Sequence, residues 1–69
     1  MKTRLASKTV VKETLINLVN FGYTVEKIEN TPFKSSWVVY DSFDKVVFRA
    51  LPHSSGKNYL IQYDTGVMI

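Results

Sequence analysis

The apolar positions between residues 7 and 20 recur at helical spacing, while the polar positions fall mostly on the other side. Such a pattern predicts an amphipathic helix of about four turns. Four apolar residues lie three or four positions apart and share its inner face: Val11, Leu15, Leu18 and Val19.

Both ends of this helix carry capping signals. Ser7 or Thr9 can supply the side-chain oxygen of an N-cap. At the other end, Gly22 suits the left-handed C′ position, which places Tyr23 over Leu18 in a Schellman motif. The sequence therefore predicts a helix that ends at Gly22 and turns directly into a strand.

After Gly22 the chain has the pattern of β structure. The expected strands are TVEKIE (24–29), SWVVY (36–40), KVVFRAL (45–51) and NYLIQY (58–63), with residues 67–69 as a short closing strand or tail. In the first of them Val25 and Ile28 lie three apart, which favours a bulge or a short strand. The segments 36–40 and 45–51 form the best hairpin, because the acidic stretch between them favours a tight turn.

The register of this hairpin decides which side chains form the core. If Val39 pairs with Val46, the core face carries Trp37, Val39, Val46 and Phe48. The other face then carries Val38, Tyr40, Lys45, Val47 and Arg49. A shift of one residue exchanges the sets on one strand, so the pairing stays a hypothesis.

One helix followed by three or four antiparallel strands is an α+β domain, with the N-terminal amphipathic helix packed on one face of the sheet. We expect a basic N-terminal arm over residues 1–6 and a single domain over residues 7–69. The 69 residues are 45% hydrophobic and 22% charged, which is typical of a globular chain. Since the chain has no cysteine, disulfides and thiolate zinc sites are excluded, and we expect stability from packing alone.

The positive charge is concentrated at the start of the chain. The formal net charge is +3, and residues 1–12 carry four Lys or Arg and no acidic residue. Residues 13–69 hold the other five Lys or Arg and all six Asp or Glu. Lysines near a helix N-terminus oppose the helix dipole, so their presence there indicates either a solvated tail or a contact with an anion.

We expect a cytoplasmic protein that does not enter membranes. No stretch approaches the roughly 20 apolar residues that span a bilayer, and no apolar segment follows the basic start as in a signal peptide.

Three short motifs are reminiscent of enzymes, but each has a simpler interpretation. Asp64-Thr65-Gly66 resembles the catalytic turn of aspartic proteases, yet only five residues follow Asp64, too few for the rest of a cleft, which favours a β-turn. Ser54-Ser55-Gly56-Lys57 resembles part of a P-loop, but Leu51 stands where glycine is required.

The third candidate is His53, the only histidine, which is flanked by serines on a loop. Neighbouring loop residues do not easily build a nucleophile and its base, and one histidine without cysteine disfavours a transition-metal site. Asp41 and Asp44 are explained by a turn. We therefore predict a protein that is not an enzyme and has no cofactor.

The residues that best indicate a function are basic and aromatic. Unpaired bases stack on exposed aromatic rings while lysine and arginine contact phosphates. We expect Lys2, Arg4, Lys8 and Lys12, on and next to the basic arm, as electrostatic contacts. On an aromatic sheet face away from the helix, we expect Tyr40, Arg49, Tyr59 and Tyr63 as stacking or supporting residues. RNA or single strands are favoured over duplex DNA because the chain lacks a second helix for a helix-turn-helix.

A protein partner is the alternative. Tyrosine, tryptophan and arginine are also common hot-spot residues of protein interfaces. A small phage- or antitoxin-like protein that inhibits a host enzyme or toxin would have this size and these surplus aromatics. A homodimer through the last strand is a further expectation, since residues 67–69 would form an apolar edge.

Overall fold

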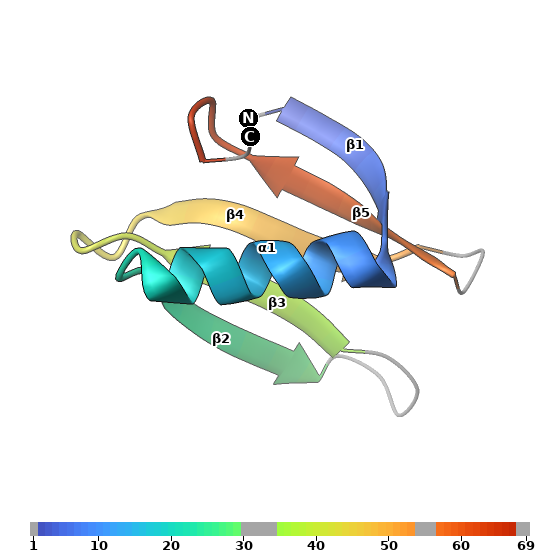
Figure 1. Cartoon of the computed structure of the whole chain (residues 1–69), viewed down its shortest axis with the longest axis horizontal. Helices are drawn as coiled ribbons and strands as arrows, with labels where there is room; N and C mark the ends of the chain where they lie inside the picture. The colour runs from blue at the N-terminus through green and yellow to red at the C-terminus, as the bar shows by residue number, and fades with distance from the viewer. Residues whose placement is uncertain (1, 30–34, 54–56, 68–69) are drawn as a thin grey trace.

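The computed structural model describes residues 2–29, 35–53 and 57–67. In chain order the elements are β1 (Lys2–Ser7), α1 (Lys8–Asn20), β2 (Thr24–Glu29), β3 (Ser35–Tyr40), β4 (Val46–Pro52) and β5 (Asn58–Tyr63). The strands form one antiparallel sheet in the order β1-β5-β4-β3-β2, and α1 lies across one face (Figure 1). The α+β prediction is confirmed, but the sheet has five strands rather than three or four.

The additional strand is the segment expected to be a basic arm. Residues Lys2–Ser7 pair antiparallel with β5 along their whole length, from Lys2 opposite Tyr63 to Ser7 opposite Asn58. The expectation of an arm over residues 1–6 is therefore wrong for residues 2–6. The sequence of this segment contains no apolar run that would indicate a strand. An edge strand here does not need one, because Ala6 is the only residue of β1 that is buried.

β1 and β2 form the two edges of the sheet and run in the same direction, so α1 has to cross the sheet to connect them (Figure 1). The helix contacts β1, β5 and β2 on the way. Since β5 lies between β1 and β4, it offers no free edge for another chain. Residues 68 and 69, part of the expected dimerising strand, lie outside the described residues.

Both predicted helix caps are confirmed. The Ser7 hydroxyl accepts a hydrogen bond from the Val10 N–H at 3.2 Å. At the other end Gly22 has φ +96°, and its N–H donates to the Val19 carbonyl at 3.0 Å. The Tyr23 N–H donates to the Leu18 carbonyl, also at 3.0 Å, which completes the Schellman motif.

The core lies between α1 and the sheet. Its fully buried centre consists of Val39, Phe48, Ala50 and Ile61, and Val11, Leu15 and Leu18 cover it from the helix. Val19 was predicted on the same helix face but is 53% exposed, and it lines an open groove beside the helix.

The hairpin register differs from the predicted one by a bulge. Val39 pairs with Phe48 and Tyr40 with Val46, so the prediction that Val39 pairs with Val46 is wrong. The bulge leaves Val47 as an extra residue in β4, and it packs into the core. β2 is a six-residue strand that pairs with β3 without a register shift, so of the two expectations for this segment, a bulge or a short strand, the bulge is wrong.

Candidate functional site

An open groove of about 580 Å³ runs beside α1, between the helix and the sheet. This volume is in the range of small-molecule pockets, roughly 300–1,000 Å³. One stripe of the helix and three positions on the strands line it: Lys8, Val11, Lys12, Leu15, Ile16, Val19, Asn20, Val25, Trp37 and Tyr59.

The helix forms one wall of the groove with side chains that recur every three or four residues. Lys8, Lys12 and Ile16 succeed one another at intervals of four, and Val19 follows one turn later. Ile16 is 52% exposed and Val19 is 53% exposed, although both are apolar. The helix therefore has a wider apolar surface than the sheet covers, with two lysines at its N-terminal end.

The sheet supplies the floor through side chains of its helix-facing side. Val25 on β2 pairs with Val39 on β3, and Trp37 lies two residues before Val39 on the same side. Both Val25 and Trp37 are half-buried and pack against the core. Trp37 is the only tryptophan of the chain. The floor is thus aromatic and aliphatic and remains accessible from solvent.

Lys27 of β2 adds a third lysine next to Trp37, although it does not itself line the groove. It pairs with Trp37 across β2 and β3, and its Nζ lies 5.6 Å from the centre of the indole ring. A cation within about 6 Å of a ring is attracted by the negative face of the ring. A ligand on Trp37 would therefore meet a positive charge from β2 as well as those of α1.

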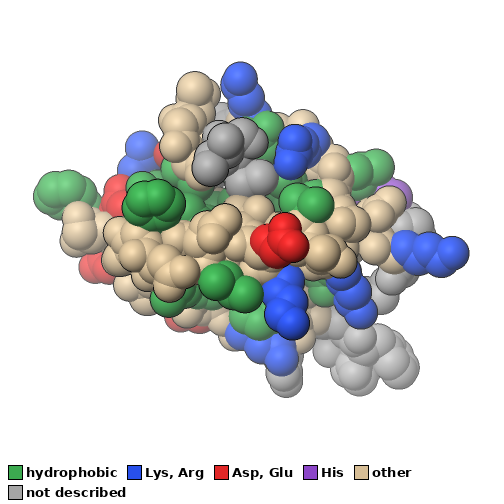
Figure 2. Space-filling view, in the orientation of Figure 1, with side chains coloured by type: hydrophobic (Ala, Val, Ile, Leu, Met, Phe, Trp, Pro, Cys, Tyr) green, Lys and Arg blue, Asp and Glu red, His purple; other side chains and the backbone are tan. Residues whose placement is uncertain are grey.

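The register places four other predicted site residues on the same side of the sheet as the groove. Lys2 lies opposite Tyr63, Arg4 lies opposite Ile61, and Tyr59 lines the groove. Figure 2 shows Lys and Arg side chains distributed around the face that carries α1, with hydrophobic side chains between them. Lys2, Arg4, Lys8, Lys12, Tyr59 and Tyr63 therefore share one side of the molecule.

Tyr40 and Arg49 lie on the opposite side. Arg49 pairs with Val38, and both Val38 and Tyr40 alternate with the buried Val39. Because successive residues of a strand point to opposite faces, these two side chains cannot join the groove. The predicted site is thus divided, with six of its eight residues on the helix side.

The sequence interpretation did not identify four residues of this region as site residues: Ile16, Val19, Lys27 and Trp37. Trp37 and Val19 were assigned to the core, and Lys27 was not singled out. The signal for Ile16 was present, since it continues the four-residue spacing of Lys8 and Lys12. The signal for Lys27 required knowledge that β2 pairs with the strand that carries Trp37.

Of the three enzyme-like motifs, Asp64-Thr65-Gly66 adopts a turn. The Val67 N–H donates to the Asp64 carbonyl at 3.1 Å and Gly66 has φ +98°, which is the predicted β-turn. Ser54, Ser55 and Gly56 lie outside the described residues. Among the residues described, no group of three or more His, Cys, Asp or Glu could hold a metal ion. Within the same ranges, no helix is long and apolar enough to cross a membrane.

In comparisons with known proteins, the chain matches no protein-family model, no curated protein and no solved structure.

Proposed function

We propose that the protein binds single-stranded nucleic acid, RNA in the first place, in the groove beside α1. The observation that carries this proposal is an aromatic floor, Trp37, in a groove lined by the exposed Lys8 and Lys12 of α1, with the exposed Lys27 of β2 over the indole ring.

Each part of the groove matches one part of a nucleotide. A base that stacks on an aromatic ring contributes about 1–3 kcal/mol to the binding free energy, whichever of the four bases it is. Its phosphates then lie within reach of the long lysine side chains at the rim. Lys2 and Arg4 on β1 extend the positive charge along the same side of the sheet. A net charge of +3 supports binding to a polyanion.

Single strands fit this arrangement better than a duplex does. The Trp37 ring lies on the floor, between a helix wall and the sheet. A base must present its flat face to stack there, and in a duplex that face is covered by the neighbouring base pair. The groove makes no demand on base identity, so we expect weak sequence preference.

The test is a titration of a short mixed-sequence single strand, followed by the fluorescence of Trp37. As the sole tryptophan, it reports directly on a base that stacks in the groove. We expect quenching with micromolar affinity at low salt, and a log-log salt slope near −2, from about three phosphate contacts at roughly −0.7 each. A matching DNA strand and a duplex of the same sequence complete the series.

Matched charge variants locate the site. Lys12→Gln should weaken binding several-fold and reduce the salt slope by about 0.7. Lys45→Gln makes the same charge change outside the groove, at a residue paired with Asp64, and should have little effect. Equal losses in both variants, or binding without a change in Trp37 fluorescence, would argue against this groove as the site.

A protein partner is the second candidate, and the half-exposed Ile16 and Val19 favour it. An amphipathic helix with acidic residues could place its apolar face in the groove. Failure of every single strand to bind at low salt would leave this candidate in place of nucleic acid.

A further inference from the structure

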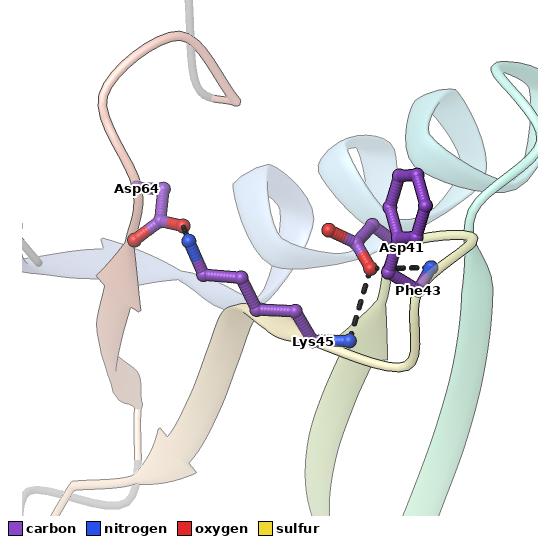
Figure 3. A network of polar contacts seen from close by, with 4 residues as sticks. All are labelled: Asp41, Phe43, Lys45 and Asp64. Carbon is purple, nitrogen blue, oxygen red and sulfur yellow. Dashed lines mark hydrogen bonds and ion pairs between the residues drawn. The ribbon is translucent and has the colours of Figure 1, made fainter.

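The turn between β3 and β4 presents a phenylalanine to solvent from a rigid base. Phe43 is 88% exposed, more than any other large apolar side chain among the described residues. An Asp41 carboxylate oxygen accepts hydrogen bonds from the N–H of Phe43 at 2.8 Å and from the N–H of Lys45 at 2.9 Å (Figure 3). We refer to residues 41–45 as the Phe43 tip.

The backbone of the Phe43 tip is equally well defined. The Asp44 N–H donates to the Asp41 carbonyl at 3.1 Å, and the Asp41 N–H donates to the Lys45 carbonyl at 2.9 Å. Asp44 takes the left-handed conformation, φ 60°, as expected in a three-residue hairpin loop. Lys45 forms an ion pair at 3.6 Å with Asp64, the residue that follows β5. Little backbone entropy would therefore be lost if this turn contacted a partner.

The charges of the Phe43 tip and of the groove are complementary. Asp41 and Asp44 flank Phe43, and the only lysine of the tip is paired with Asp64. The groove has an apolar floor and two lysines, Lys8 and Lys12, on its helix wall. Since Phe43 is 88% exposed, it does not occupy the groove of its own chain.

We propose that the Phe43 tip of one copy docks into the groove beside α1 of a second copy. Phe43 lies on the apolar floor near Ile16 and Val19, and the tip carboxylates face the lysines of the helix wall. The contact joins two different surfaces, so a pair of copies leaves one tip and one groove available unless the arrangement closes.

This inference rests on the groove being a binding surface, as the proposed function does. The two occupants exclude each other, so single-stranded nucleic acid should release the second copy. The test below contains no nucleic acid, so its failure leaves the proposed function untouched. Conversely, a lack of nucleic-acid binding would not affect self-association.

The experiment is sedimentation equilibrium of the whole chain from about 0.05 to 1 mM, at low and high salt. We expect the average mass to rise with concentration, with a dissociation constant on the order of 0.1–1 mM, as for a contact made by one side chain. The rise should shrink at high salt because the carboxylate and lysine attraction is screened. A wild-type protein that stays monomeric throughout would overturn the proposal.

Three variants identify the surfaces. Phe43→Ser removes the apolar end of the tip, and Val19→Glu places a carboxylate in the groove; both positions are exposed, so the fold should be retained. Each variant alone should be monomeric at the highest concentration. Phe21→Ser is the matched control, since Phe21 is 78% exposed and does not line the groove. An equal loss of association in Phe21→Ser would indicate non-specific hydrophobic association and overturn the proposal.

A mixture of the two defective variants gives the decisive result. The Phe43→Ser protein keeps an intact groove and the Val19→Glu protein keeps an intact tip. A 1:1 mixture should therefore form a dimer and nothing larger, although neither component associates alone. If the mixture remains monomeric while the wild type associates, the contact uses other surfaces and the proposal is wrong.

Discussion

Lys8 stands where a cation is electrostatically unfavourable, and replacing it should move stability and binding in opposite directions. It is the first residue of α1, directly after the N-cap Ser7, and the first turn of the helix contains no acidic residue. The helix dipole places about half a positive charge at this end. Lys8→Glu removes a repulsion and adds an attraction.

The size of the effect follows from the exposed position of Lys8. Each charge near a helix end contributes about 0.3–1 kcal/mol at low ionic strength, so the reversal should raise the free energy of unfolding by roughly 0.6–2 kcal/mol. For a domain of this size, about 4–8 °C in Tm corresponds to 1 kcal/mol. We expect Tm to rise by roughly 3–15 °C at low salt and by less at high salt.

Binding should respond in the opposite sense, since Lys8 lines the groove. Loss of one phosphate contact and a new repulsion should weaken single-strand affinity at low salt by at least about tenfold, and should reduce the salt slope by roughly 0.7. Thermal unfolding by circular dichroism and the Trp37 titration measure the two effects on the same samples.

Thr9→Glu is the control for this prediction. Thr9 is exposed in the first turn and does not line the groove, so its replacement should give about half of the stability gain while Lys8 remains. If Lys8→Glu stabilises the protein but leaves binding unchanged, Lys8 is not retained for an anionic ligand. If it lowers Tm, the dipole argument itself is refuted.

Four further variants test stability and are measured by urea unfolding. Gly22→Ala should cost about 1 kcal/mol from backbone strain alone, because Gly22 has φ +96° and a Cβ there would meet no atom within 4 Å. Asp44→Gly should stabilise the protein by up to about 1 kcal/mol, since it relieves a left-handed residue, φ 60°, that bears a side chain. Phe48→Ala should cost about 3–5 kcal/mol because Phe48 is fully buried. Phe43→Ala should be nearly neutral at 88% exposure. A Phe43→Ala loss as large as that of Phe48→Ala would contradict the burial argument.

Local interactions account for what could be predicted from the sequence. The helix ends were predictable because the N-cap hydroxyl and the Schellman glycine act within a few residues of the backbone groups they satisfy. The tight turn between β3 and β4 was predictable for the same reason, since Asp41 bonds to amides two and four residues away. The general α+β arrangement followed from these elements.

Contacts between distant residues account for the rest. Residues 2–7 form a strand because they pair with β5, which lies more than fifty residues later in the chain. No local sequence pattern indicates this pairing. A bulge next to Tyr40 put Val47 rather than Val46 into the core. The pairing of β4 with β5 placed Tyr59 and Tyr63 on the helix side, whereas alternation along β3 and β4 put Tyr40 and Arg49 on the other side. The groove joins Lys8 and Ile16 on α1 to Val25 and Trp37 on the strands. The sequence by itself thus determined the helix, its caps and the main turn, whereas the tertiary structure alone decided which charged and aromatic side chains meet, because strand pairing depends on non-local hydrogen bonds and packing.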